Sequence, residues 1–135
     1  MRRVAEWILA SVAAAVCVAA ALAFSRQDDL WPLPGLYLVE IAVAGGLGLT
    51  AVARSRADVP GWSLIPWVAA GVLLAFVILG AWTIGLFIAP AAVALFLAGY
   101  LADLRLERRV PGHVAAFLGA AVIQASVMWV VFTSR

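Results

Sequence analysis

The sequence contains no lysine, and it has a single cysteine and a single histidine. Without lysine the chain has neither a Schiff-base amine nor the lysine of a phosphate-binding loop. Cys17 alone excludes an internal disulfide, and His113 alone cannot supply a two-histidine haem or dimetal site. The sequence also has no nucleophile elbow and no cysteine or histidine set with metal-binding spacing. We therefore expect a protein that is not an enzyme and that uses no cofactor or metal.

Charged residues are also scarce, at 12% of the 135 residues, whereas hydrophobic residues make up 67% and the mean hydropathy is +1.11. Soluble domains have about 25% charged and about 45–50% apolar residues. A lipid bilayer is therefore the solvent that fits this chain. The net charge of +2 comes entirely from arginines in short connecting segments. That placement indicates membrane orientation signals rather than binding to nucleic acid.

The apolar residues form long continuous runs rather than alternating patterns, which favours helices over a β-barrel. The sequence predicts an all-α integral membrane protein with one transmembrane domain, residues 1–135, and five transmembrane helices. The predicted helices are residues 4–24, 33–53, 62–79, 85–102 and 113–132.

The apolar region from Trp62 to Ala102 must contain a reversal of chain direction. As one helix it would be about 60 Å long, which is twice the hydrocarbon thickness of a bilayer. Gly80 and Gly85 bracket the only plausible turn, so we expect two helices here, the second kinked at Pro90. The alternative is a re-entrant pair that never crosses the membrane.

The first apolar segment has two interpretations. Its basic start and the small residues Ala21-Leu22-Ala23 are typical of a signal peptide. Its apolar run of about 20 residues is long for a signal peptide, so we favour a retained transmembrane helix. On one face of this segment every fourth residue has a small side chain, which lets another helix approach closely. The residues of this stripe are Ser11, Ala15, Ala19 and Ala23.

The arginines predict the orientation. With five crossings, all but Arg26 and Arg135 lie on the side of the N-terminus. The arginine-rich side is the cytoplasmic one, so we expect the N-terminus inside the cytoplasmic membrane and the C-terminus outside. Tryptophans near the predicted membrane surfaces agree, with Trp31, Trp82 and Trp129 on the outer side.

Residues 31–81 and 82–133 are predicted to form two tandem helical hairpins after a lead-in helix. The first hairpin contains Gly-Leu-Tyr-Leu from residue 35, and the second contains Gly-Leu-Phe-Ile from residue 85. Val-Pro-Gly closes the loop of each hairpin, with one residue of slip. A duplication would relate the hairpins by an axis along the membrane normal. The alternative is chance similarity, because alanine, valine and leucine dominate the whole chain.

Glu40 is the only carboxylate well inside an apolar segment, and it is the first candidate functional residue. A charge at the bilayer centre costs about 2.5–3.5 kcal/mol on insertion scales, so Glu40 should face protein or water. Ala44 and Gly48 continue its helix face and should admit a close neighbour. Glu40 is expected to bind a proton or cation, to hold helices together as a protonated or hydrogen-bonded carboxyl, or to reach the outer membrane surface.

Gln124 is the second candidate, and an interhelical hydrogen bond is the favoured role for it. Ala116 and Ala120 precede it on the same face as helix-packing positions. Glu6 is expected to be solvated near the inner membrane surface, and His113 is expected to be solvated or to face lipid there. Cys17 is expected to be a small buried hydrophobe.

Two functions fit these observations. The favoured one is a non-catalytic accessory, structural or assembly subunit of a larger membrane complex, because the chain is small, its loops are minimal and its helices have small-residue faces. The alternative is a small oligomeric transporter or channel that uses Glu40. The expected partners are the lipid bilayer and either membrane-protein subunits or further copies of the chain.

Overall fold

A computed structural model shows five α-helices, and no strand is present in the described residues, which are 1–26, 33–55, 61–106 and 110–134. The helices are α1 (Arg2–Phe24), α2 (Leu33–Arg54), α3 (Leu64–Leu79), α4 (Gly85–Leu106) and α5 (Val110–Thr133). The predicted helices are confirmed within a few residues. Four of them, α1, α2, α4 and α5, are long and apolar enough to cross a membrane, and α3 is a shorter apolar helix.

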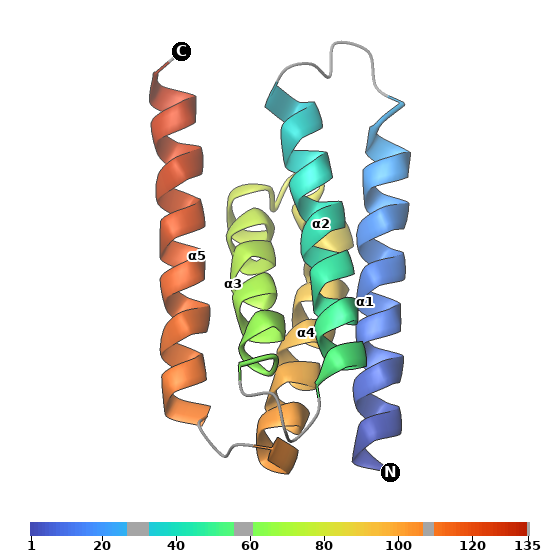
Figure 1. The fold of residues 1–135 in the computed structure, drawn as a ribbon. Helices are drawn as coiled ribbons and strands as arrows, with labels where there is room; N and C mark the ends of the chain where they lie inside the picture. The colour runs from blue at the N-terminus through green and yellow to red at the C-terminus, as the bar shows by residue number, and fades with distance from the viewer. Residues whose placement is uncertain (27–32, 56–60, 107–109, 135) are drawn as a thin grey trace.

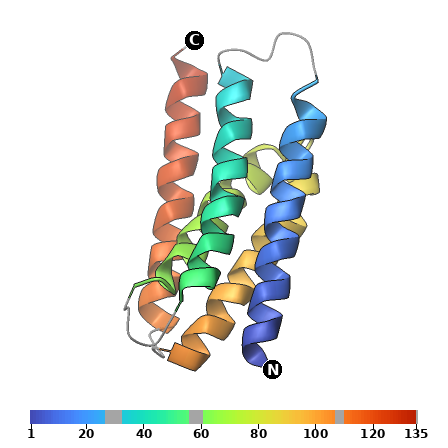
Figure 2. The same ribbon diagram turned by 45° about the vertical axis from the view of Figure 1, so that its right-hand side comes forward.

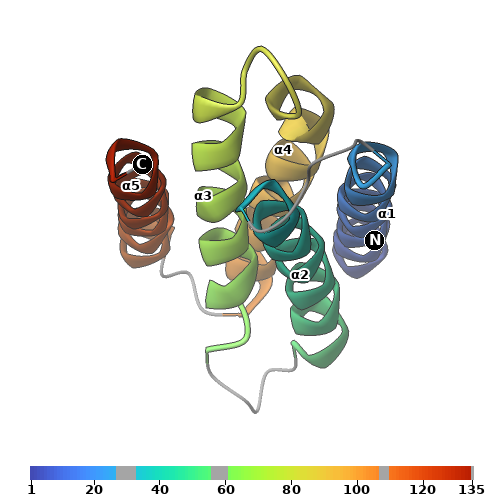
Figure 3. The same ribbon diagram turned by 90° about the horizontal axis from the view of Figure 1, so that it is seen from above.

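The first four helices form a bundle, and α5 is attached to its side. α1 packs against α2 and α4, and α3 packs against α4 and, less extensively, against α2. α5 packs along α3 and barely touches α4 (Figures 1 and 2). The view from above shows α5 beyond α3, on the side of the bundle away from α1 (Figure 3). The N-terminal helix is therefore an integral part of the bundle, and α5 is the peripheral helix.

Small residues dominate the core and bring the helix backbones close together. Its buried alanines include Ala13, Ala70 and Ala91, all fully inaccessible. At two glycines of α2 the neighbouring helices lie so close that there is no room for a side chain. A Cβ on Gly45 would lie 2.8 Å from the Cβ of Cys17 in α1, and a Cβ on Gly48 would overlap Leu95 in α4. Close backbone approach of this kind is how helices associate when lipid is the solvent.

The predicted reversal between Gly80 and Gly85 is confirmed. α3 ends at Leu79, and the amide of Gly85 donates a 2.7 Å hydrogen bond to the carbonyl of Gly80. A Cβ on either glycine would press on backbone oxygens of this turn, which explains the glycine at each end. The turn lies well below the upper ends of α1, α2 and α5, because α3 is short and the hairpin is inclined (Figures 1 and 3).

The last two helices differ most from their predicted bounds. α4 was expected to end at residue 102 but continues to Leu106, and α5 begins at Val110 rather than His113. The helical extension carries the charged residues Asp103 and Arg105, for which a connecting loop was predicted. Both are tied to neighbouring helices, as described below. α4 is continuous through Pro90, which is exposed on its surface.

The described residues leave two sequence predictions open. The alignment of residues 31–81 with 82–133 stays a prediction. In the structure α2 and α3 pack together, whereas α4 and α5 are splayed. The orientation also stays a prediction, and Arg56, Arg108 and Trp31 lie outside the described residues. The two ends of the chain do lie at opposite ends of the bundle (Figure 1).

Candidate functional site

The polar residues buried most deeply lie at the end of the bundle where the chain begins. Glu6 of α1 is fully buried, and its carboxylate accepts two hydrogen bonds from the Arg105 guanidinium of α4, at 3.0 and 2.9 Å. Arg105 Nη2 also donates a 3.3 Å hydrogen bond to the hydroxyl of Ser55, the residue that follows α2. We call these three residues the Glu6 network. Its bidentate ion pair joins α1 to α4 and is among the strongest pairings of side chains, and its hydrogen bond to Ser55 adds the end of α2.

Helix periodicity explains why these three residues meet. Ala10 of α1, Val52 of α2 and Ala98 of α4 pack together as a small buried cluster. Glu6 lies four residues before Ala10 and Arg105 lies seven residues after Ala98, so each occupies the same helix face as its apolar neighbour. The contact face that is apolar in mid-bundle therefore ends in charged residues near the bundle end.

A second buried pair joins α4 to α5. The Asp103 carboxylate of α4 is fully buried, and its Oδ1 lies 2.6 Å from Nδ1 of His113 in the first turn of α5. This contact is an ion pair when the imidazole is protonated and a hydrogen bond from Nδ1–H when it is neutral. The centroid of the His113 ring lies 6.4 Å from that of Trp67 in the first turn of α3, so the pair also lies next to α3.

Trp67 is the centre of an aromatic cluster beside the Asp103–His113 pair. Its ring makes edge contacts with Phe96 of α4 and Phe117 of α5, at centroid distances of 4.9 and 6.4 Å. A Cβ on Gly99 would collide with the indole, so the glycine provides the space for it. The indole Nε1 has no hydrogen-bond partner among the described residues. Trp67 thus fills the junction of α3, α4 and α5 mainly by its size.

Together the two pairs make the lower end of α4 a junction for the fold. Arg105 holds α1 and the end of α2, and Asp103 holds α5. Breaking a buried ion pair by removing one partner commonly costs about 3–5 kcal/mol, because the other charge stays buried. The geometry therefore fixes which helices lie next to each other at this end.

The chemistry available at this site is limited. A histidine–aspartate pair acts as a base in hydrolases when a nucleophile hydrogen-bonds to the second imidazole nitrogen. No serine, threonine or cysteine in the described part of the chain forms such a bond with His113. The described residues also contain no group of three or more potential metal ligands.

The two predicted functional residues are not brought together. Glu40 is partly buried on α2, and no described residue forms a hydrogen bond or ion pair with it. Gln124 is one of only two buried residues of α5, and its Nε2 has no hydrogen-bond partner among the described residues. The expected interhelical hydrogen bond of Gln124 is therefore absent there. α2 and α5 do not pack against each other.

The predicted packing residues divide between core and edge. Ala44 is 6% exposed and belongs to the core of the bundle, and Gly48 is buried against Leu95 of α4. Ala116 and Ala120 are only partly buried. Ala120 lies at the crossing of α5 with α3, where Gly71 of α3 has no room for a side chain.

Two expectations about polar residues were wrong. Glu6 was expected to be solvated near the membrane surface, and His113 to be solvated or to face lipid, but Glu6 is inaccessible and His113 is 8% exposed. In each case a side chain of α4 supplies the hydrogen bonds that water would otherwise provide. The available signal was charge complementarity: Glu6, Asp103, Arg105 and His113 all fall at the same predicted membrane surface. Cys17 is buried in the core, as predicted.

The site thus consists of two buried polar contacts, Glu6 with Arg105 and Asp103 with His113, which link helices at one end of the bundle. Comparison of the chain with protein-family models, with curated proteins and with solved structures found no match.

Proposed function

We propose that the chain is a small non-catalytic protein of the cytoplasmic membrane that crosses it five times, with its N-terminus inside. The apolar helices and the placement of the termini at opposite ends support this topology. The arginine distribution supports the orientation. The Glu6 network and the Asp103–His113 pair then lie near the cytoplasmic surface, where charged groups cost less to bury than at the bilayer centre.

Within that membrane, we propose that the protein is an accessory or assembly subunit of a larger complex. The observation that carries this proposal is the position of α5. α5 is attached to the bundle along one side, and only His113 and Gln124 of its 24 residues are buried. Its remaining surface presents large apolar side chains such as Ile123 and Trp129, which are 66% and 65% exposed. A helix held by one neighbour is well placed to pack against a partner helix.

The buried polar residues support the same proposal. In the described residues, the strongest polar contacts link one helix of the chain to another, as in Glu6 with Arg105 and Asp103 with His113. Groups engaged in this way hold the fold and are not free to bind a substrate. The protein would then act through the shape and surface of its helices.

The test is purification in mild detergent combined with crosslinking from single positions. A photo-crosslinking residue at Ile123, on the open side of α5, should join the chain to one foreign membrane subunit present in stoichiometric amount. The same residue at Leu36, which is 52% exposed on α2, is the matched control and should not capture that subunit. The intact mass of the purified complex would identify the stoichiometry. A complex containing only copies of this chain would contradict the accessory role.

A small oligomeric transporter or channel is the second candidate, and one observation favours it. Glu40 and the Nε2 of Gln124 have no hydrogen-bond partners among the described residues, and both lie within apolar helices. Glu40 lies about 10 Å along α2 from its first residue, and Gln124 about 13 Å from the last residue of α5, at 1.5 Å per residue. Unpaired polar groups at this depth are found in ion pathways. A pure homo-oligomer in the purification would favour this candidate.

A further inference from the structure

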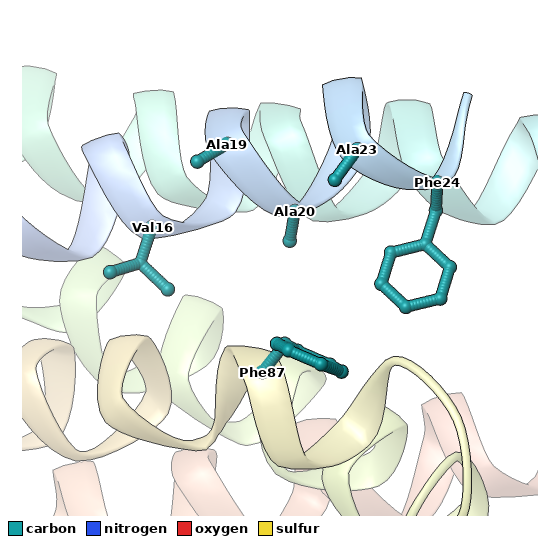
Figure 4. A pocket seen from close by; sticks show the side chains of 6 residues that line it. All are labelled: Val16, Ala19, Ala20, Ala23, Phe24 and Phe87. Atoms are coloured by element: carbon teal, nitrogen blue, oxygen red, sulfur yellow. The ribbon is translucent and has the colours of Figure 1, made fainter. Parts of the chain in front are cut away.

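A groove between α1 and α4 is the feature of the fold that the proposed function does not use. It has a volume of about 430 Å³ and is lined by Val16, Ala19, Ala20, Ala23 and Phe24 of α1 and by Phe87 of α4. Figure 4 shows the alanines along one wall and the two phenylalanine rings meeting at one end. The rings are in edge contact, with centroids 5.7 Å apart. All six lining side chains are hydrocarbon.

A second hollow lies on the other side of Phe24. It has a volume of about 350 Å³ and is lined by residues of α1, α2, α3 and α5, among them Tyr37, Phe76 and Met128. The second hollow is also lined by Gly80, Thr83 and Ile84, which belong to the α3–α4 turn. This turn stops short of the upper ends of α1, α2 and α5 (Figures 1 and 2). The short hairpin thus leaves unfilled apolar space in the outer half of the bundle.

The chemistry of the groove restricts its occupant. Water is a poor occupant, because even apolar cavities of about 150 Å³ stay dry and take up hydrocarbon instead. A helix about 10 Å in diameter fills about 120 Å³ per residue, so the volume of the groove corresponds to only about one helical turn. A hydrocarbon chain is thin enough to enter and makes van der Waals contacts with the alanine wall.

The charged residue closest along the chain to this end of the groove is an arginine. Arg26 is exposed two residues beyond Phe24, and it is the only arginine of the described residues at this end of the bundle. An arginine at this position complements the phosphate of a phospholipid whose chain lies beside Phe24 and Phe87.

We propose that the groove between α1 and α4 binds one acyl chain of a phospholipid, with the phosphate held by Arg26. This inference rests on the proposed placement of the chain in a membrane. It explains the stripe of small residues on α1, of which Ala19 and Ala23 are exposed and line the groove. Larger side chains there would occupy the space that the acyl chain fills.

Native mass spectrometry of the delipidated protein, titrated in detergent with dioleoyl phosphatidylglycerol, tests the proposal. The wild type should retain one lipid. Ala19→Phe fills the groove and should weaken lipid binding about threefold or more, a modest change because lipid and detergent are themselves apolar. Ala15→Phe is the matched control, since Ala15 is exposed one turn away on the same stripe but does not line the groove. It should leave binding unchanged.

Arg26→Gln separates the headgroup from the chain. It should weaken binding of phosphatidylglycerol while leaving binding of dioleoylglycerol, which has no phosphate, unaffected. The proposal is overturned if the wild type retains no lipid, or if Ala15→Phe weakens binding as much as Ala19→Phe. It is also overturned if Ala19→Phe loses a protein partner and keeps the lipid. Failure of the accessory role is measured separately, by photo-crosslinking from Ile123 on α5. Failure of the membrane placement would also be distinct, because it would give a protein that is soluble without detergent.

Discussion

Arg105→Leu is expected to lower the free energy of unfolding by about 3–5 kcal/mol, because it leaves the Glu6 carboxylate buried without its partner. Glu6 is fully inaccessible and accepts both of its side-chain hydrogen bonds from Arg105. The reverse change, Glu6→Leu, should cost less, about 1–3 kcal/mol. The side chain of Arg105 is 24% exposed, so it can extend toward the aqueous surface when Glu6 is absent.

The measurement is the folded fraction of each variant during titration with a denaturing detergent. Arg54→Leu is the matched control: it removes an exposed arginine of α2 that lies over the ring of Trp62 and forms no ion pair with a described residue, and it should cost at most about 1 kcal/mol. The double variant Glu6→Leu/Arg105→Leu should recover much of the loss, because two apolar residues replace the pair. Equal costs for Arg105→Leu and Arg54→Leu would show that the Glu6 network contributes nothing to stability.

Gly71→Ala should displace α5 and destabilise the protein by about 1–3 kcal/mol, although alanine normally favours helices. A Cβ on Gly71 would overlap the backbone carbonyl oxygen of Phe117, and a backbone atom cannot move without the helix that carries it. α5 packs almost entirely on α3, so apart from this packing its displacement is opposed mainly by the Asp103–His113 pair in its first turn. Spin labels at Val12 of α1 and Val127 of α5 should report a longer or broader distance distribution.

The control for this prediction is Gly119→Ala in α5. A Cβ at Gly119 has no neighbour within 4 Å, so the substitution should stabilise the helix by about 0.5–1 kcal/mol. The two glycines therefore give opposite signs for the same chemical change. If Gly71→Ala were as stable as wild type and left the distance between the labels unchanged, the close contact of α3 with α5 would be wrong.

The helices could be predicted from the sequence because the length of an apolar run is a strong signal. The need for a turn between α3 and α4 followed from length, since one helix of that length would exceed the membrane, and the two glycines Gly80 and Gly85 located it. The end of α4 could not be found in the same way. Hydropathy places charged residues outside the membrane, so it ended the helix before Asp103. The helix continues because both charged residues are paired with residues of other helices, Asp103 with His113 of α5 and Arg105 with Glu6 of α1.

The order of packing could not be predicted at all. Every helix is apolar around most of its surface, so hydropathy does not say which helices are neighbours. The decisive features are single positions without a side chain, such as Gly45 against Cys17 and Gly71 against Phe117. Their importance depends on what lies opposite. Glu40 stands out in the sequence as the only carboxylate well inside an apolar segment, but it forms no hydrogen bond or ion pair with a described residue. Glu6, for which a solvated position was expected, is the buried carboxylate of the Glu6 network.

The central claim is that the chain crosses the membrane five times with the Glu6 network at the cytoplasmic side. Its most direct test is the location of reporters fused after Arg56, Trp82, Arg109 and Arg135. We predict that these positions are inside, outside, inside and outside. A cytoplasmic reporter after Arg135 would contradict five crossings, and a reporter after Trp82 that never reaches the outer side would show that α3 and α4 form a re-entrant pair.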